Sequence, residues 1–166
     1  MTGEIILRDV IASDLPVFFE NQLDPIANRM AAFTAKDPAD REAFMAKWAK
    51  ILADPGIKLK TVLFEGQVAG SVLSHGWFSD PEVCYWFGRA FWGKGIASRA
   101  LAEFLICQKL RPLYARVVKD NAASLRVLGK CGFSICGHDK GFANGRGEEV
   151  EELVLVLKAE AESEAK

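Results

Sequence analysis

The chain has 166 residues, of which 50% are hydrophobic, and its formal net charge at pH 7 is −1. This length is enough for one sizeable hydrophobic core and too short for two. A net charge near zero gives no basic field for nucleic acid, so we expect no nucleic-acid partner. No apolar run approaches the ~20 residues that cross a bilayer, so we expect no membrane partner either.

The four cysteines lie at positions 84, 107, 131 and 136, without CxxC spacing and in apolar surroundings. This pattern favours buried free thiols in a reducing cytosol. Only two histidines are present, His75 and His138, so no metal site is expected. The amino-terminal residues lack the charged-then-apolar pattern of a signal peptide, which predicts a cytoplasmic protein.

The amino-terminal part predicts one strand followed by helices. Ser13-Asp14-Leu15-Pro16 is typical of a helix start, with Ser13 as N-cap and the proline in the first turn. Asp37-Pro38 predicts the start of a longer helix with an apolar side, ending before Asp54-Pro55-Gly56. The expected elements are a strand over 4–9, the helix from Ser13, a short helix over 26–33 and the helix through 53.

Strands and helices alternate in the remainder. Glu65-Gly66 predicts a hairpin turn between strands over 58–64 and 67–77. The further elements expected are strands over 82–87 and 113–118, a helix over 95–109, a short helix from 121, a loop with three glycines over 141–147, and strands over 133–138 and 149–157. Residues 1–158 are expected to form a single domain, and the charged tail over 159–166 to be disordered.

The stretch from Tyr85 to Ser98 is the most informative one, because an aromatic strand runs through a glycine-rich turn directly into a helix. Such a turn directs free backbone N–H groups and the positive end of a helix dipole at one point, which suits a phosphate. Residues 88–95 also spell the GxxxxGK pattern of a nucleotide-binding loop, but Gly95 replaces the serine or threonine that holds magnesium. A dinucleotide GxGxxG pattern fails as well, because Ser98 replaces the third glycine.

The segment Trp92-Gly93-Lys94-Gly95-Ile96-Ala97 resembles the acetyl-CoA pyrophosphate loop of the GCN5-related N-acetyltransferase (GNAT) family, whose pattern is Gln/Arg-x-x-Gly-x-Gly/Ala. Gly95 and Ala97 match this pattern, and Trp92 departs from it. An aromatic or polar residue at that position is usual in the branch similar to the ribosomal-protein acetyltransferases (RimJ/RimL). The strand Glu82-Val83-Cys84-Tyr85-Trp86 is similar to the acidic-x-x-Tyr-Trp strand of the same branch.

A second motif strengthens the resemblance. Asn121-Ala122-Ala123-Ser124, followed by a short helix and Gly132-Phe133, resembles the second cofactor segment of the family. The resemblance extends over about residues 67–157. It implies the GNAT fold, an α/β (α+β) architecture with a central mixed, mostly antiparallel sheet of six to seven strands and helices on both faces. It also implies acetyl-CoA as the cofactor.

The resemblance assigns cofactor binding to the two motifs and to the backbone of the strand before the loop. Lys119 and Arg126 are candidates for the 3′-phosphate of CoA, with surface solvation as the alternative for each. The cofactor-binding residues implied are Cys84, Tyr85, Trp86, Trp92, Gly93, Lys94, Gly95, Ile96, Ala97, Ser98, Asn121 and Ser124.

Two catalytic roles are implied. Glu82 is the candidate for removing the amine proton through a water molecule, and a solvated glutamate at a strand end is the alternative. Many family members carry a tyrosine where this chain has Leu128, so Ser124 becomes the hydroxyl that donates to the CoA sulfur, with helix capping as its alternative. Asn121 binds the cofactor or orders its own turn.

The acetyl acceptor is expected to bind among residues of the amino-terminal helices and the strand near His75, which are Asn28, Arg29, Met30, Phe33, His75 and Trp77. The apolar lining without an acidic cluster argues weakly against polyamines. We therefore predict an acetyl-CoA-dependent N-acetyltransferase that acts on a protein N-terminus or a small amine by direct attack in a ternary complex. The alternative is a non-catalytic acetyl-CoA-binding domain. The sequence leaves open whether two copies form a homodimer.

Overall fold

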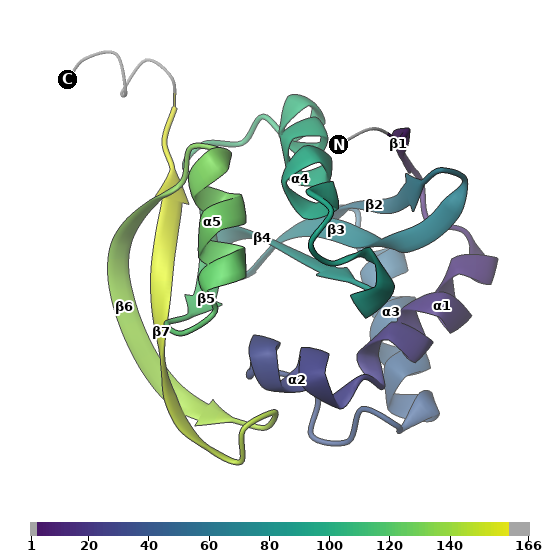
Figure 1. The fold of residues 1–166 in the computed structure, drawn as a ribbon, viewed down its shortest axis with the longest axis horizontal. Coiled ribbons are helices and arrows are strands. Elements are labelled where there is room, and N and C mark those ends of the chain that lie inside the picture. The colour runs from purple at the N-terminus through teal and green to yellow at the C-terminus, as the bar shows by residue number, and fades with distance from the viewer. Residues whose placement is uncertain (1–2, 160–166) are drawn as a thin grey trace.

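The computed structural model describes residues 3–159, which form a seven-stranded sheet with helices on both faces (Figure 1). The strand order is β1-β2-β3-β4-β5-β7-β6, and neighbouring strands are antiparallel except for β4 and β5, which are parallel. The predicted α/β class with a mixed, mostly antiparallel sheet is confirmed. The tail predicted to be disordered lies, apart from its first residue, outside the described residues.

The order of elements follows the prediction closely. Among the described residues, no helix is long and apolar enough to cross a membrane. The elements are β1 (Ile5–Arg8), the 3-10 helix η1 (Ala12–Asp14), α1 (Leu15–Gln22), α2 (Pro25–Ala31), α3 (Arg41–Ala53), β2 (Lys58–Phe64), β3 (Gln67–Phe78), β4 (Asp80–Phe87), the 3-10 helix η2 (Arg89–Phe91), α4 (Ile96–Cys107), β5 (Leu113–Val118), α5 (Ala122–Lys130), β6 (Ser134–Ala143) and β7 (Glu148–Leu157).

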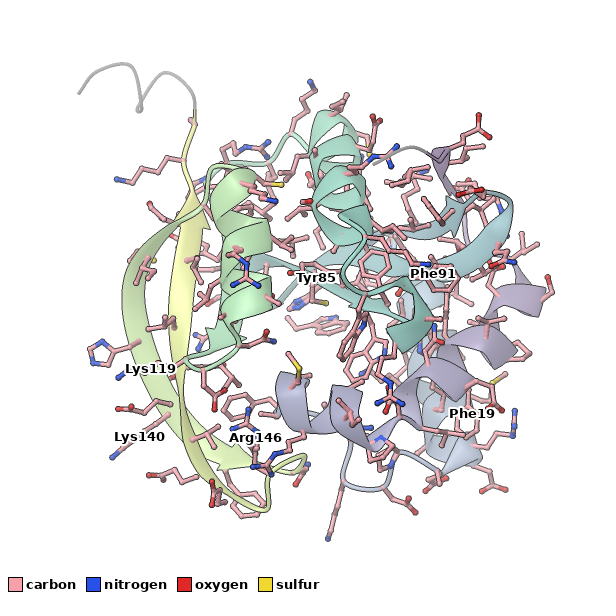
Figure 2. The ribbon with its side chains drawn as sticks, in the orientation of Figure 1. Phe19, Tyr85, Phe91, Lys119, Lys140 and Arg146 are labelled. Atoms are coloured by element: carbon pink, nitrogen blue, oxygen red, sulfur yellow. The ribbon has the colours of Figure 1, made fainter. Side chains whose placement is uncertain are left out.

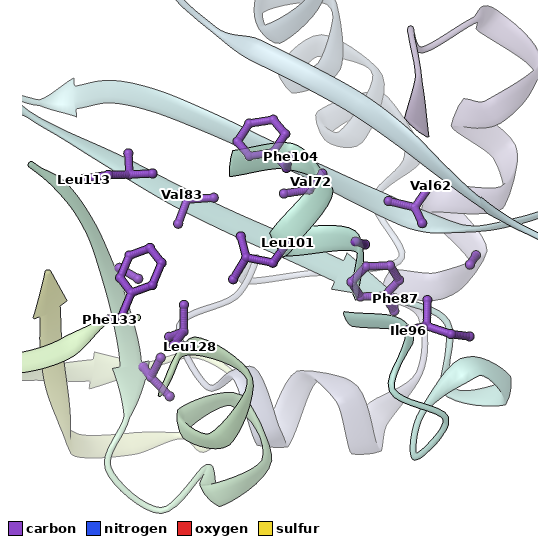
Figure 3. Close-up of a cluster of buried hydrophobic side chains, with 14 of the residues drawn as sticks. Val62, Val72, Val83, Phe87, Ile96, Leu101, Phe104, Leu113, Leu128 and Phe133 are labelled. Atoms are coloured by element: carbon purple, nitrogen blue, oxygen red, sulfur yellow. The ribbon is translucent and has the colours of Figure 1, made fainter. Parts of the chain in front are cut away.

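Alternation along the strands divides the core between the two faces of the sheet. On β3, Val72 packs into the cluster beneath α4 and α5, whereas its neighbour Leu73 packs into the cluster beneath α1 and α3. The larger cluster is shown in Figure 3 and includes Ile96, Leu101, Phe104, Leu113, Leu128 and Phe133. Because α4 and α5 are anchored in this cluster, their first turns have fixed positions.

The prediction that Ser13 caps the first helix is wrong. Ser13 lies within η1, and Asp14, which is 1% exposed, is the polar residue that organises this corner. The Asp14 carboxylate accepts hydrogen bonds from Arg8 at 2.7 and 2.9 Å, from the Ile11 backbone N–H at 3.0 Å and from the Thr61 hydroxyl at 2.7 Å. Thr61 lies on β2, so this carboxylate joins the start of the first helix to the sheet.

We expect Asp14→Asn to destabilise the protein at neutral pH. Burial alone would raise the pKa of Asp14, but the hydrogen bonds from Arg8, Ile11 and Thr61 outweigh it and lower the pKa to about 2. A carboxyl whose pKa falls from 3.8 to about 2 on folding contributes about 2 kcal/mol above pH 4, and this is lost as the pH falls toward 2. Denaturant unfolding of the wild type and the variant between pH 7 and pH 2 measures this.

Asp9 supplies the matched control for this experiment. Its carboxylate forms an ion pair with Lys60 at 2.8 Å, but its side chain is 89% exposed. Water and salt screen such a pair, so Asp9→Asn should leave stability unchanged within error. Equal losses for the two variants would contradict the role given to Asp14.

Two predicted boundaries are wrong for local reasons. The third helix begins at Arg41, because the Asp40 carboxylate caps it by accepting from the Ala43 N–H at 3.0 Å, and Asp37 instead closes a separate turn onto Ala39. The predicted loop over 141–147 is partly strand, since β6 continues to Ala143. That extension lengthens the β6–β7 hairpin until its tip meets α2 (Figure 1).

Candidate active site

The two parallel strands at the centre of the sheet separate. Among the described residues, β4 and β5 pair at one position, Glu82 with Tyr114, near the amino-terminal end of each strand. Beyond it the strands diverge, and each leads at its carboxyl end into a helix, β4 into α4 and β5 into α5 (Figure 1). The carboxyl ends of parallel strands, where helix N-termini converge, are where open α/β sheets bind ligands.

The loop before α4 has the backbone that anion binding requires. Gly93 and Gly95 have φ values of +75° and +74°, which residues with a side chain rarely adopt. A Cβ on either glycine would point into open space, so the side of the loop where a ligand would lie is clear of protein atoms. No side chain caps α4, and its first-turn N–H groups have no acceptor within the helix. These features fit a pyrophosphate.

The flanking residues hold this loop in place. The indole of Trp92 donates to the Phe87 carbonyl at 3.0 Å, so the residue that departs from the family pattern ties the loop to the end of β4. The Ser98 hydroxyl donates to the Gly95 carbonyl at 3.2 Å. Ile96 is 1% exposed and belongs to the core, so only its backbone faces outward. Lys94 is exposed.

The second helix beside the gap is capped by a side chain. Asn121 accepts from the Ser124 N–H at 3.2 Å, and its amide donates to the Met30 carbonyl at 3.4 Å, which links α5 to α2. The Ser124 hydroxyl lies 2.7 Å from the Tyr85 hydroxyl on β4. Leu128 is 1% exposed and packs in the core, so it offers no hydroxyl to the gap. Lys119 pairs with Glu151 at 3.4 Å, and Arg126 is exposed.

Glu82 lies where the two strands are still joined, and it is 8% exposed. Burial, the largest effect, raises the pKa of its carboxyl; Arg116 opposes this, and Glu152 and Asp80 add to it. The Arg116 guanidinium lies 3.7 Å from Glu82 and 2.8 Å from Glu152, with a third carboxylate, that of Asp139, at 3.5 Å. Three carboxylates from three strands thus gather around one arginine, outside the set of residues predicted to line the acceptor site.

Next to Glu82 in the sheet lies His75, its register partner on β3. The His75 ring is buried, stacks on Trp77 with centroids 3.9 Å apart, and accepts from the Trp77 N–H at 3.3 Å. Burial and the nearby Lys47 lower the pKa of His75, which favours the neutral ring. Trp77 is 45% exposed, so this pair presents an aromatic surface beside the carboxylate.

Of the acceptor residues predicted on or next to α2, Asn28 has a structural contact, whereas Arg29, Met30 and Phe33 are at least partly accessible. The Asn28 amide donates to the carbonyls of Gln22 and Asp24 at 2.6 and 2.9 Å, so its side chain holds the turn between α1 and α2. Arg29 and Phe33 are exposed, and Met30 is partly buried.

The tip of the β6–β7 hairpin closes onto α2. Arg146 donates to the Arg29 carbonyl at 2.5 Å and forms a two-pronged ion pair with Asp120 at 2.8 and 3.0 Å. Gly145 donates to the Ala32 carbonyl at 2.8 Å, and a Cβ on Gly145 would overlap the Asn28 carbonyl oxygen. Only glycine allows this approach, which we call the α2–hairpin clasp (Figure 2 labels Arg146).

The cysteines are free, as predicted, but their predicted burial is wrong. Cys84, Cys107 and Cys136 are exposed, and Cys131 is partly buried. Cys84 alternates with Tyr85 along β4, so its thiol faces the side of the sheet that carries Glu82 and Trp86. The indole of Trp86 donates to the Asn21 carbonyl at 3.2 Å and fixes the end of α1.

Sequence reasoning missed the side-chain roles of Tyr85, Arg116 and Arg146. Their partners lie on other elements of the fold, at least 39, 23 and 26 positions away in the chain, respectively. No local pattern signals such pairs. The presence of Tyr85 in a recognised motif was the single available hint.

Comparison with known proteins defines the class. Residues 4–134 match the family model described as acetyltransferase (GNAT) domain, and no curated protein matches the chain significantly. Among solved structures, Mycobacterium smegmatis RimJ in complex with CoA-disulfide superposes with a TM-score of 0.77 at 22% identity, covering 95% of this chain and 83% of that one.

Two further structures show the same fold. The microcin C7 self-immunity acetyltransferase MccE, in complex with acetyl-CoA and AMP, has a TM-score of 0.77 at 15% identity, covering 94% of this chain and 93% of that one. The ribosomal-protein-S5-alanine acetyltransferase from Vibrio fischeri has a TM-score of 0.72 at 18% identity, covering 96% and 98%.

The chain belongs to the GNAT acetyltransferase family. GNAT acetyltransferases use acetyl-CoA, which confirms the cofactor predicted from the sequence. The open space beside Gly93 and Gly95, and the uncapped first turn of α4, fit the pyrophosphate of that cofactor.

Proposed function

We propose that this protein is an N-acetyltransferase that transfers acetyl from acetyl-CoA to a primary amine by direct attack in a ternary complex. The observation that carries the proposal is the gap between β4 and β5, with a phosphate-binding loop at its open end and the buried carboxyl of Glu82 at its closed end. Family membership supports the donor. The buried carboxyl supports a catalytic domain over a domain that only binds the cofactor.

The cofactor is held mainly by backbone in this proposal. The N–H groups of residues 93–98 receive the pyrophosphate at the N-terminus of α4, and Lys94 adds a positive charge. Backbone groups of Cys84, Tyr85 and Trp86, freed where β4 leaves β5, orient the acetyl carbonyl and stabilise the negative charge that develops on its oxygen. Asn121 orders the first turn of α5 on the other side of the gap.

Glu82 is the proposed proton acceptor. An alkylammonium group has a pKa of about 10, so it must lose a proton before its nitrogen can attack. Burial brings the pKa of Glu82 above its ordinary value and toward that of the amine, while the charge of Arg116 opposes this rise. A water molecule between the carboxylate and the amine completes the relay.

The acceptor is proposed to enter between the aromatic pair His75–Trp77 and the α2–hairpin clasp, past Met30 and Phe33. The carboxylates around Arg116 outnumber its single positive charge and favour a cationic amine. Solved structures of a RimJ and of a ribosomal-protein-S5-alanine acetyltransferase share the fold, which supports a protein N-terminus as acceptor and the RimJ/RimL branch. Small amines are the second group to test.

A calorimetric titration with acetyl-CoA, CoA and ATP–magnesium tests the donor. We expect micromolar binding of acetyl-CoA and CoA, and no response to ATP. The saturated protein is then offered peptides with different N-terminal residues and a panel of small mono- and polyamines, and release of free CoA thiol is followed. Binding of CoA without turnover on any amine would favour the non-catalytic alternative, and binding of ATP alone would overturn the proposal.

A further inference from the structure

Two hydroxyl groups join β4 to the start of α5. Tyr85 extends from β4 and Ser124 lies in the first turn of α5, and their oxygens are 2.7 Å apart. Figure 2 places Tyr85 between α4 and α5. On β4, this side-chain contact therefore lies beyond Glu82, the position where backbone pairing with β5 is found.

Either hydroxyl can donate in this contact, and we take Tyr85 as the donor. Burial raises the pKa of the Tyr85 phenol, so it keeps its proton at neutral pH and has one proton to donate. Among the hydrogen bonds found for the described residues, the partner of the Tyr85 hydroxyl is the Ser124 hydroxyl. With Tyr85 as donor, the Ser124 oxygen accepts and its own proton remains available for another acceptor.

The Ser124 oxygen is also held from the backbone side. The Ser124 backbone N–H donates to the Asn121 carboxamide, which fixes the first turn of α5. The Tyr85 ring packs against Phe87, with ring centroids 5.8 Å apart. The Tyr85 hydroxyl is thus carried by a packed ring, and the Ser124 hydroxyl by a turn that is held in place. A donor held in advance costs little reorganisation when charge develops beside it.

We propose that Tyr85 is a positioning residue that holds the Ser124 hydroxyl so that it donates a hydrogen bond to the cofactor sulfur as that sulfur leaves. This inference rests on the proposed function. In the reaction, the amine nitrogen forms the bond to the acetyl carbon, the carbon–sulfur bond breaks, and its electron pair goes to the sulfur. The amine proton leaves toward Glu82.

The hydroxyl proton stays on Ser124. A thiol has a pKa near 8.5 and a phenol one near 10, so a thiolate is too weak a base to deprotonate this pair. The pair therefore stabilises a negative sulfur by a charge-assisted hydrogen bond and is not consumed as an acid. This differs from a tyrosine acting at the position of Leu128, which is buried in the core here.

The test compares Tyr85→Phe, Ser124→Ala and the double variant with the wild type. Binding of CoA and of desulfo-CoA, which lacks the sulfur, is measured by calorimetry at a pH above that of thiol ionisation. We expect each variant to weaken CoA binding about tenfold or more, because a hydrogen bond to a charged group is lost. Desulfo-CoA affinity should be unchanged, and the double variant should be no worse than either single one.

A second readout needs no ligand. The chain has two tyrosines, so carbon-13 labelling of the tyrosine rings gives two NMR signals, and Tyr114→Phe assigns them and serves as the control. Once the phenol ionises it can only accept, so the Ser124 hydroxyl then donates to the phenolate and lowers the pKa of Tyr85. Ser124→Ala should therefore raise the pKa of Tyr85 further. Tyr114→Phe should leave CoA binding unchanged.

Three results would overturn the inference. Equal losses for CoA and desulfo-CoA would make the pair a structural brace. A selective loss in Ser124→Ala without one in Tyr85→Phe would remove the positioning role of Tyr85. An unchanged Tyr85 pKa in Ser124→Ala would rule out the contact itself. If the wild type bound neither ligand, the proposed function would fail first, and the inference with it.

Discussion

Gly95→Glu should abolish binding of acetyl-CoA and of CoA while the protein stays folded. A glutamate at this position places a carboxylate at the N-terminus of α4, where it competes for the N–H groups and repels the pyrophosphate. Losing two charge-assisted hydrogen bonds of about 1.5 kcal/mol each already weakens binding about 100-fold. Calorimetry at concentrations that saturate the wild type measures cofactor binding, and circular dichroism measures whether the variant is folded.

Gly66→Glu is the matched control for this variant. Gly66 has a φ of +81°, and a Cβ there would point into open space, as at Gly95, but Gly66 lies in the turn between β2 and β3. The two substitutions therefore add the same charge and a similar backbone strain. We expect full cofactor affinity in Gly66→Glu. Wild-type affinity in Gly95→Glu would show that the loop is not the pyrophosphate site.

Glu82→Gln should lower turnover by about 100-fold or more, the usual contribution of a general base, with little change in cofactor affinity. The amide keeps the shape of the side chain but accepts no proton. The deficit should shrink as the pH approaches about 10, because the amine then loses its proton to solvent. Steady-state rates between pH 5 and pH 10, measured at saturating acetyl-CoA, test this.

The raised pKa of Glu82 also predicts how the reaction rate changes with pH. Burial raises the pKa of Glu82 above its ordinary value of 4.5, so its protonated, inactive form persists to a higher pH. The wild-type rate should therefore fall as the pH drops through that raised pKa, and Glu82→Gln should lack this limb. Asp139→Asn removes a more exposed partner of Arg116 and is the control. A wild-type rate and profile in Glu82→Gln would remove Glu82 from the mechanism.

The sequence predicted those parts of the site that are local in the chain. Gly93, Gly95 and the start of α4 follow one another directly, so turn chemistry and helix geometry suffice to define the loop. The sheet was predictable for the same reason, since alternation and turn residues mark each strand. Asn121 was predicted with both of its roles open, and its side chain does cap α5.

Features that depend on register between distant strands could not be predicted. Arg116 meets Glu82 and Glu152 only because β5 lies between β4 and β7 in the sheet. The helix boundary at Asp40 was missed because Asp37 and Asp40 are equally good caps, and the fold selects one. The exposed side of Cys84 follows from its strand face, which the apolar composition around it does not reveal.

The α2–hairpin clasp has a consequence for the order in which the protein folds during synthesis. It joins residues near position 30 to residues near position 145, so the ends of a loop of more than 100 residues must meet before the clasp can form. Closing so long a loop carries an entropic cost that is repaid only by the contacts formed last. A chain still emerging from the ribosome therefore cannot close the clasp until the β6–β7 hairpin has been made.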